Sequence, residues 1–408
     1  MSHHTFYLGD TLEVLKSLPD KKYQCCITSP PYWGLRDYGV PGQLGLETTP
    51  EEYVAKMVEV FREVRRVLRD DGVLWLNLGD SYASRPQNDK FADPKAPRRT
   101  PFNRCRTNTL KPKDLIGTPW MVAFALRADG WYLRSDIIWE KPNPMPESVT
   151  DRPTKSHEYL FLLSKSEKYY YDQDAIREPH KREHLNRYKY QFWPEGTKES
   201  IGCGRPDGAS NTGGVKSFNP AGRNRRSVWK VATKSFKGAH FATFPPKLIE
   251  PCILAGTSPQ ACPVCGGLWR RIKKKTGHRN KREDAHVPNN TPTKTDSTGW
   301  APTMEATNIF QPTCKCEGND GSGKSIILDP FGGAGTTTLQ AMTHDRDSIY
   351  IDLNPEYLNL ALNRLGFGEN QPRLLEYHTH EIIKLNQISP PSPAQPAGNS
   401  EKWSRQSR

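Results

Sequence analysis

Apolar residues along the first 165 positions alternate between the spacing typical of helices and the unbroken runs typical of buried strands. Leu12, Leu15 and Leu18 recur at helical spacing, and a longer amphipathic helix is predicted at 50–68. Asp70-Asp71-Gly72 then predicts a turn. The other elements predicted here are a helix at 118–129 and strands at 6–8, 23–27, 73–78, 131–140 and 158–164.

The second half of the chain resumes this alternation after an irregular middle. Residues 178–229 are rich in Gly, Asn, Arg and aromatic residues and show little periodicity. Strands and helices in alternation predict a three-layer α/β fold with a mostly parallel sheet, whose pieces lie on both sides of that middle. The later elements are strands at 325–328 and 348–353 and helices at 243–256, 336–343 and 355–365.

The pattern divides the chain into one core with two insertions and a tail. Residues 387–408 lack a core-forming pattern and are expected to be disordered. The other expected divisions are a catalytic region at 1–178, a first insertion at 179–235, a cofactor-binding part of the same core at 236–257 and 325–386, and a cysteine-rich basic insert at 258–324.

The charge of the chain favours a polyanionic partner. Its 58 basic and 45 acidic residues give a formal net charge of +13, which suits nucleic acid first, although a merely basic soluble protein has the same balance. No apolar run approaches the roughly 18 residues that span a bilayer. The start Met1-Ser2-His3-His4 lacks the pattern of a signal peptide, so we expect a cytoplasmic protein without a membrane partner.

Residues 28–33 (TSPPYW) follow a predicted strand and can form a socket for a planar amine. Pro30 and Pro31 fix φ and remove two N–H donors, so nearby carbonyls are left to accept hydrogen bonds. Ser29 adds a hydroxyl acceptor, and Tyr32 and Trp33 offer flat faces for stacking. The exocyclic amine of a nucleobase fits such a corner. A Pro-Pro pair after a strand is also common as a simple rigid turn.

A glycine-rich loop follows the predicted strand at 325–328. Residues 329–337 (DPFGGAGTT) lead into a helix start, where glycines and free N–H groups let a ligand approach the backbone. The next strand ends in Asp352, a carboxylate that suits two ribose hydroxyls. The loop lacks both the phosphate-loop ending and the dinucleotide fingerprint. We therefore expect a nucleoside cofactor without a pyrophosphate, the alternative being a generic glycine-rich turn.

These motifs resemble those of the S-adenosylmethionine-dependent, amino-group DNA methyltransferases. Residues 329–337 look like the cofactor-binding loop of that family, and 28–32 (TSPPY) look like its catalytic motif. The catalytic motif comes first, which resembles the circularly permuted β-group, whose enzymes act on cytosine N4 or adenine N6. The segments IIWEKPN and HEYLFLLS are similar to further motifs of the family, so the likeness covers most of the core.

The resemblance implies a three-layer, Rossmann-like methyltransferase fold and a set of site residues. The Ser29 hydroxyl and the Pro30 carbonyl would accept from the target NH2 within the motif Ser29-Pro30-Pro31-Tyr32, and Tyr32 would stack on a base flipped out of the duplex. Serine at the first position favours cytosine N4 over adenine N6. The residues implied for the cofactor are Asp10, Asp329, Pro330, Phe331, Gly333, Gly335, Thr336 and Asp352.

Four of the nine cysteines are clustered, as Cys262-x-x-Cys265 and Cys314-x-Cys316. Four thiolates suffice for a structural, tetrahedral zinc site, and the first pair with its following glycines resembles a zinc-ribbon knuckle. The short spacing of the second pair and the long gap between pairs leave reduced, unliganded thiols as the alternative. The run 270–282 in this insert holds eight Lys or Arg residues and is expected to contact DNA backbone.

Double-stranded DNA is the expected partner. The basic loop from Arg85 to Lys113 is expected to hold the backbone unless it is only a solvated loop, and 179–235 is the candidate target-recognition region, with Arg223, Arg225 and Arg226 among its candidate contacts. A cognate restriction endonuclease acting on the same site is a further candidate partner. The target sequence and the oligomeric state stay open. The competing functions are an RNA or protein methylase and a non-catalytic DNA-binding protein on this scaffold.

Overall fold

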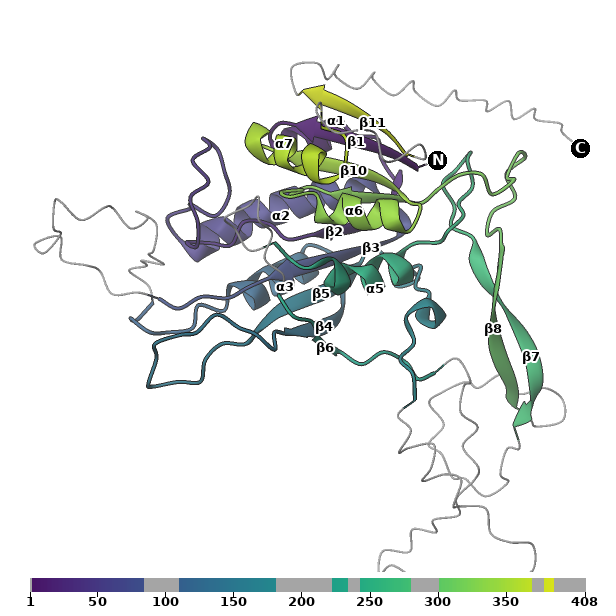
Figure 1. Cartoon of the computed structure of the whole chain (residues 1–408), viewed down its shortest axis with the longest axis horizontal. Coiled ribbons are helices and arrows are strands. Elements are labelled where there is room, and N and C mark those ends of the chain that lie inside the picture. The colour runs from purple at the N-terminus through teal and green to yellow at the C-terminus, as the bar shows by residue number, and fades with distance from the viewer. Residues whose placement is uncertain are drawn as a thin grey trace, which may run out of the picture.

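The chain folds around one nine-stranded sheet in a computed structural model, which describes residues 2–83, 110–180, 222–233, 243–279, 301–368 and 378–384 (Figure 1). The strand order is β11-β1-β10-β9-β2-β3-β5-β4-β6, and β7 and β8 form a separate two-stranded ribbon. The strands are β1 (Ser2–Leu8), β2 (Tyr23–Thr28), β3 (Leu68–Leu78), β4 (Tyr132–Glu140), β5 (His157–Ser164), β6 (Val228–Lys230), β7 (Arg270–Arg279), β8 (Ala301–Gln311), β9 (Ile326–Asp329), β10 (Asp347–Asp352) and β11 (His378–Lys384). The helices are α1 (Thr11–Ser17), α2 (Pro50–Val67), α3 (Thr118–Ala128), η2 (Gln173–Ile176, a 3-10 helix), α5 (Pro246–Gly256), α6 (Thr336–Thr343) and α7 (Pro355–Arg364).

Most neighbouring strands of the large sheet run parallel. The pairs from β11 to β3 are all parallel, β5 is antiparallel to both β3 and β4, and β4 pairs with β6 in parallel. The prediction of a mostly parallel α/β sheet is therefore confirmed. The strands β1, β10, β9, β2, β3 and β4 all end at one side of the sheet, which we call the carboxyl edge, and the side where they begin is the amino edge.

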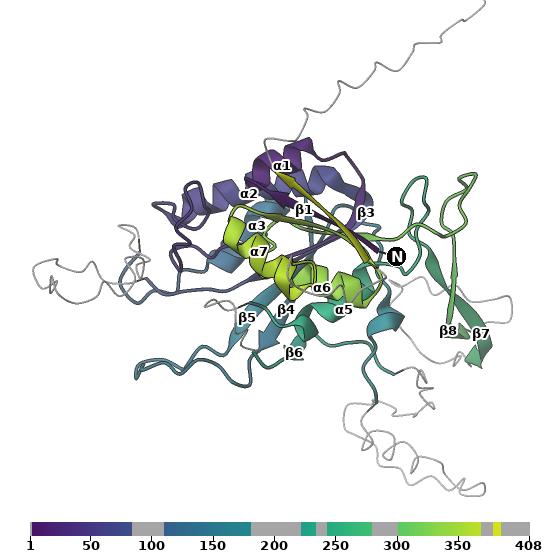
Figure 2. The ribbon, with the colours of Figure 1, turned by 45° about the horizontal axis from the view of Figure 1, so that its top comes forward.

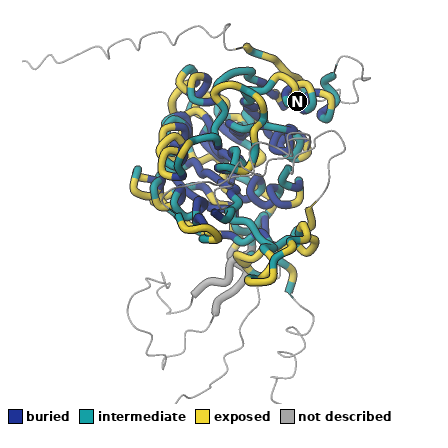
Figure 3. Tube along the Cα trace, turned by 90° about the vertical axis from the view of Figure 1, so that its left-hand side faces the viewer, coloured by how far each residue is buried: buried dark blue, intermediate teal, exposed yellow. Residues whose placement is uncertain are grey.

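Helices cover both faces of the sheet, which gives the three predicted layers (Figure 2). One face packs against α1, α2 and α3, whose buried residues join a common cluster with β2 and β3. The other face packs against α5, α6 and α7 in two further clusters. Buried positions gather in this layered body (Figure 3).

Helix α2 shows how local sequence sets these layers. Thr49 caps it by accepting a hydrogen bond from the Glu52 N–H at 3.2 Å, and Pro50 occupies the first turn, where no N–H donor is needed. Tyr53, Phe61 and Val64 lie on the buried face. Burial of this apolar face against the sheet stabilises the helix and fixes where the loop before it leaves the carboxyl edge.

The structure differs from the sequence-based expectation at one predicted turn and at four strands that were not predicted, β6, β7, β8 and β11. Residues 70–72, predicted as a turn, belong to β3, whose pairing with β2 shifts register between Tyr23 and Cys25, so the turn-like residues are absorbed as an irregularity. Strand β11 was not predicted, because most of its residues are exposed and no apolar pattern marks it. The predictions for residues 84–109 of the basic loop, 181–221 of the first insertion and the 387–408 tail concern positions outside the described residues. Within the described part of the chain, no helix has both the length and the apolar character of a membrane span.

Candidate functional site

The carboxyl edge brings together motifs that lie far apart in the chain. Strands β2 and β9 are neighbours, with Cys26 opposite Leu328, so the residues that follow them meet. The Thr28 hydroxyl donates to Asp329 Oδ1 at 2.7 Å across 301 positions of sequence. A crevice beyond the carboxyl ends of neighbouring strands is the usual ligand site of an open α/β sheet. The predicted catalytic and cofactor motifs therefore occupy one place.

The glycine-rich loop after β9 is folded against the end of β10. Asp352 Oδ2 accepts from the Gly333 N–H at 2.8 Å, and its Oδ1 accepts from the Asn354 N–H at 2.8 Å. The Thr11 hydroxyl donates to the Pro330 carbonyl at 2.7 Å, which ties the loop to α1. Asp10 caps α1 by accepting from the Glu13 N–H at 3.1 Å. Asp10, the loop and Asp352 thus line three adjacent strand ends.

Two glycines of this loop are needed for its shape. Gly335 has φ +70° and begins α6, and a Cβ there would lie 3.0 Å from the Cβ of Ala361. A Cβ at Gly332 would lie 2.2 Å from ring atoms of Tyr350. The loop is therefore pressed against α7 and β10, and its backbone can face a ligand.

Burial sets the charge of the two carboxyls at this edge. Burial raises the pKa of Asp329 to about 6, partly offset by hydrogen bonds from Thr337 and Thr28. Burial likewise raises the pKa of Asp352 to about 6, partly offset by backbone N–H donors. Both groups are ionised at neutral pH and become neutral in mild acid.

The loop after β2 presents an acceptor without a donor. Pro30 is buried and the Pro31 carbonyl accepts from the Tyr53 hydroxyl at 2.8 Å, whereas no described residue donates to the Pro30 carbonyl. Trp33 corrects one expectation. Its side chain is 3% exposed in the core, and its Nε1 donates to the Glu47 carbonyl at 2.9 Å. The Trp33 ring is thus part of the packing under the loop and offers no free stacking face.

The Tyr32 hydroxyl enters a polar network that the sequence analysis did not predict. It donates to Glu158 Oε2 at 2.8 Å and lies 3.3 Å from Asn77 Oδ1, and the Ser29 hydroxyl donates to the Tyr32 oxygen at 3.3 Å. The Lys141 ammonium donates to the other oxygen of Glu158. Lys141 and Glu158 lie in the IIWEKPN and HEYLFLLS segments, whose pattern alone predicted no role for either residue. The antiparallel pairing of β4 and β5 puts them together.

The Tyr32 ring lies against the end of β3. A Cβ added at Gly79 would lie 2.6 Å from Cε2 of Tyr32, so only glycine leaves room for the ring. The neighbouring Asp80 accepts from the Gly117 and Ser81 N–H groups, both at 3.0 Å. Lys155 Nζ lies 4.0 Å from Asp80, and burial lowers the pKa of this lysine. Buried charged and hydroxyl groups at the ends of β3, β4 and β5 thus surround the loop that follows β2.

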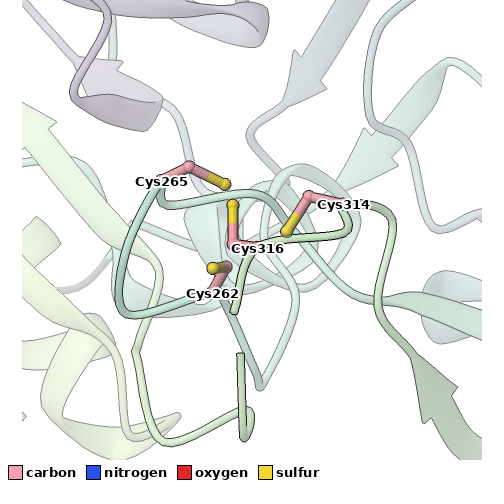
Figure 4. Close-up of side chains that lie close together, drawn as sticks. All are labelled: Cys262, Cys265, Cys314 and Cys316. Carbon is pink, nitrogen blue, oxygen red and sulfur yellow. The ribbon is translucent and has the colours of Figure 1, made fainter. Parts of the chain in front are cut away.

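The four clustered cysteines meet in space, as predicted (Figure 4). The sulfur atoms of Cys262, Cys265, Cys314 and Cys316 all lie within 4.8 Å of one another. Four thiolates around zinc are separated by about 3.8 Å at Zn–S distances of about 2.3 Å, so the donor set fits a tetrahedral ion. The side-chain amide of Asn319 donates to the Cys314 sulfur at 3.2 Å.

The cysteine cluster belongs to the amino edge. Gln24 at the start of β2 donates to the Gly266 carbonyl at 2.9 Å, and Arg69 at the start of β3 donates to the Cys265 carbonyl. The ribbon projects from this side of the molecule, away from the catalytic motif (Figure 1). Two basic residues of its run are engaged with the core, because Arg271 pairs with Asp172 at 2.8 Å and Lys273 with Asp174 at 3.0 Å.

The described part of the candidate recognition region also makes internal contacts. Arg223 and Arg226 pair with Glu178 at 3.1 and 3.4 Å, and the Arg225 guanidinium lies over the ring of Trp229 at 4.5 Å. Trp229 is buried in the core. These three arginines therefore contribute to packing beside β6, and the rest of the region lies outside the described residues.

Comparison with known proteins shows which family this chain resembles. The profile of a protein family described as DNA methylase matches residues 23–294 and 310–363. The type II methyltransferase M.Cfr9I of Citrobacter freundii is 41% identical over 362 residues, which cover 88% of this chain and 87% of the relative. M.XycI of Xanthomonas campestris pv. cyanopsidis is 41% identical over 367 residues, 90% of this chain and 88% of the relative. The crystallised PvuII DNA methyltransferase (cytosine-N4-specific) shares the fold, with a TM-score of 0.50, 16% identity and coverage of 91% of this chain and 89% of that chain.

Proposed function

This chain belongs to the DNA methylase family and is a type II DNA methyltransferase, and from that premise we propose that it methylates N4 of cytosine in double-stranded DNA, with S-adenosylmethionine as the methyl donor. The observation that carries the proposal is the 2.7 Å hydrogen bond from Thr28 to Asp329. It joins an acceptor-rich corner to a nucleoside-binding loop, so an amine in the corner would face a cofactor in the loop. Adenine N6 is the second candidate.

The cofactor would lie along the strand ends of β1, β10 and β9. Each oxygen of Asp352 already accepts one backbone N–H and keeps a lone pair for a ribose hydroxyl. Asp10 would lie at the adenine end, and Gly335, with φ +70°, makes the turn that leads the loop into α6. S-adenosylmethionine supplies an electrophilic methyl group on a positively charged sulfur. The chain then has to bind and aim the amine.

An exocyclic amine of a nucleobase is a poor nucleophile, because its lone pair is delocalised into the ring. Acceptors at both N–H groups draw the lone pair out of conjugation and fix its direction. The Pro30 carbonyl, which receives no donor from the described residues, and the Ser29 hydroxyl supply the two acceptors. A base inside a duplex reaches them only after it is flipped out, at a cost of a few kcal/mol.

The choice of cytosine is supported by Ser29. In the amino-methyltransferases that the motif resembles, serine at this position is more common in enzymes acting on cytosine N4, and Asp or Asn in those acting on adenine N6. A hydroxyl and a carboxylate both accept from an amine. Identifying the methylated base by experiment therefore decides between cytosine and adenine.

A methyl-transfer assay tests the proposal. Purified protein is incubated with duplex genomic DNA and radiolabelled S-adenosylmethionine, beside a Ser29→Ala variant, and long-read sequencing of DNA from expressing cells identifies the modified base. We expect N4-methylcytosine at one short site and at least a 100-fold slower Ser29→Ala enzyme. Methylated adenine would replace the cytosine assignment, and no methylation by wild type would overturn the proposal.

We propose three further parts of this function. Cys262, Cys265, Cys314 and Cys316 hold a structural zinc ion, which their clustering supports and which metal analysis of the purified protein would test. Residues 179–235 read the target sequence. A restriction endonuclease acting on the same site is the expected companion, because a type II methyltransferase of such a pair protects its own genome.

A further inference from the structure

The network at Tyr32 has a fixed direction of hydrogen bonding. The Lys141 ammonium can only donate, and it donates to Glu158, so the Glu158 carboxylate is held in place as an acceptor. The side-chain amide nitrogen of Asn77 donates to the Tyr159 carbonyl at 3.0 Å and to Glu158 at 3.3 Å. That arrangement turns the Asn77 oxygen toward Tyr32. The Tyr32 hydroxyl therefore faces two acceptors, at 2.8 Å and 3.3 Å.

A hydroxyl that faces two acceptors must give its hydrogen to them. The Tyr32 hydrogen goes to Glu158, the nearer and charged partner, so only a lone pair of Tyr32 remains for Ser29. The Ser29 hydroxyl accordingly donates its own hydrogen to the Tyr32 oxygen at 3.3 Å. With its hydrogen directed at Tyr32, the Ser29 oxygen has both lone pairs available to accept a hydrogen bond from the base.

We propose that Lys141 and Glu158 are positioning residues for methyl transfer, because they orient the Tyr32 hydroxyl and thereby keep Ser29 an acceptor. This inference rests on the proposed function, in which Ser29 must accept an N–H of the target base. If the Ser29 hydrogen pointed at the base instead, two donors would face each other and the amine lone pair would not be released. The pair acts through Tyr32 and touches no substrate atom.

Glu158→Gln tests the direction of the network while keeping its shape. Glutamine places its single oxygen toward the Lys141 ammonium, so its NH2 group faces Tyr32 and donates to the Tyr32 oxygen. Asn77 Oδ1 also lies 3.3 Å from the Tyr32 oxygen, so the test variant combines Glu158→Gln with Asn77→Leu, which removes that second acceptor. The Tyr32 hydrogen then points at Ser29, and the Ser29 hydrogen points at the base. We expect the single-turnover rate of methyl transfer by Glu158→Gln/Asn77→Leu to fall about 100-fold, with the affinity for S-adenosylmethionine changed by less than about two-fold.

Tyr32→Phe in the same background supplies the decisive result. Phenylalanine keeps the ring but has no hydroxyl to direct a hydrogen at Ser29. Alone, Tyr32→Phe is expected to slow transfer about 10-fold, since one hydrogen bond to Ser29 is lost. Added to Glu158→Gln/Asn77→Leu, Tyr32→Phe should make the enzyme about 10-fold faster than Glu158→Gln/Asn77→Leu, so the change that slows the wild type speeds this variant.

Glu147→Gln is the matched control. Glu147 is a carboxylate at the same edge, in an ion pair with Arg152 at 2.7 Å, and the structure gives it no contact with Tyr32. Its amide variant should methylate at the wild-type rate.

The outcomes separate this inference from the proposed function. An active wild type overturns the positioning role alone if the losses are additive when Tyr32→Phe is added to Glu158→Gln/Asn77→Leu, or if the Glu158→Gln/Asn77→Leu enzyme is unimpaired. A wild type that transfers no methyl group overturns the proposed function. If Glu158→Gln/Asn77→Leu fails to bind S-adenosylmethionine, Tyr32→Phe decides by itself, because an unchanged rate in that variant contradicts the role.

Discussion

The two edges of the sheet differ in how the polar groups around β2 and β9 are used. At the amino edge, the groups that hold the cysteine insert are paired within the protein: both ends of the Gln24 amide are used, by the Gly266 carbonyl and the Ile326 N–H, and Ser325 donates to the Ser258 carbonyl. At the carboxyl edge, Asp329 and Asp352 have raised pKa values, and the Pro30 carbonyl has no donor among the described residues.

The contrast supports the proposal that the carboxyl edge binds the ligand. Buried polar groups are normally satisfied within the protein, because an unpaired one costs about 1–3 kcal/mol. Polar groups left unpaired at the carboxyl edge lower the stability of the protein unless a bound ligand pairs with them. The paired groups at the amino edge supply stability that offsets this cost. Four changes test this division, in order of their expected effect on methylation.

Gly79→Ala should cause the largest loss of methylation. The added methyl would lie 2.6 Å from Cε2 of Tyr32 and displace the ring that supports Ser29. We expect a turnover about 100-fold slower, with cofactor affinity unchanged, in a radiolabel transfer assay. Gly318→Ala is the control, because it strains a glycine with φ +80° at the amino edge, beside the cysteines, and its added methyl has nothing within 4 Å. Equal rates for both variants would contradict the role of the Tyr32 ring.

Acid should weaken cofactor binding through Asp352. The pKa of Asp352 is raised to about 6 by burial, so below that pH the carboxyl is neutral and a poorer acceptor. Calorimetry should find S-adenosylmethionine binding about 10-fold weaker at pH 5 than at pH 7.5. Asp352→Asn should bind weakly at both values and lose most of this dependence. A flat profile in the wild type would remove Asp352 from the cofactor site.

The raised pKa of Asp352 makes protein stability depend on pH in the opposite direction to cofactor binding. Because the folded protein raises the pKa of this carboxyl from 3.8, the free energy of unfolding without cofactor should fall as pH rises from about 4 to about 6. Denaturant titrations of wild type and Asp352→Asn at these two pH values measure that difference.

Cys314→Ala should leave the chemistry nearly intact and destabilise the amino edge. The change removes one of four sulfur atoms that lie within 4.8 Å of one another, so zinc content should fall and the thermal midpoint should drop by several degrees. Methylation at 25 °C should stay within about two-fold of wild type. A chelator should lower the midpoint of wild type and leave that of the variant unchanged. A midpoint equal to wild type would show that no structural ion is held there.

Gln24→Leu should have the smallest effect on methylation, namely none. The change leaves the Ile326 N–H and the Gly266 carbonyl without their partner, at 2.7 and 2.9 Å in the wild type. We expect the free energy of unfolding to fall by about 2 kcal/mol in a denaturant titration. A reduced transfer rate in the folded variant would mean that the two edges are coupled.

The sequence predicted the core well because its strands and helices are strongly patterned. The runs at 23–27 and 73–78 are buried along nearly their whole length in β2 and β3, and α2 buries the predicted face. Strand β11 escaped prediction because its stability comes from pairing with β1 rather than from its own apolar residues. The ribbon of β7 and β8 escaped because its first strand is rich in lysine and arginine.

The site was predictable as motifs and not as contacts. Ser29, Asp329 and Asp352 stood out because each lies at or just after the end of a strand and belongs to a recognisable pattern. Glu158 did not, because its role depends on β5 running antiparallel to β3 and β4, which brings it to Tyr32 and Lys141. Trp33 was misread because an aromatic residue after a turn can face a ligand or the core, and here the Glu47 carbonyl and the packed core hold it inside.

The order of strands across the sheet has a consequence for engineering. Strand β9 lies between β2 and β10, and β1 lies between β10 and β11, so each half of the chain fills gaps left by the other. A break between β7 and β8 would leave one fragment with the amine socket and the other with the cofactor loop. On the proposed function we expect neither fragment to methylate alone, and fused dimerising partners would drive their reassembly. The architecture thus lends itself to a split enzyme that marks DNA only where two tethered halves meet.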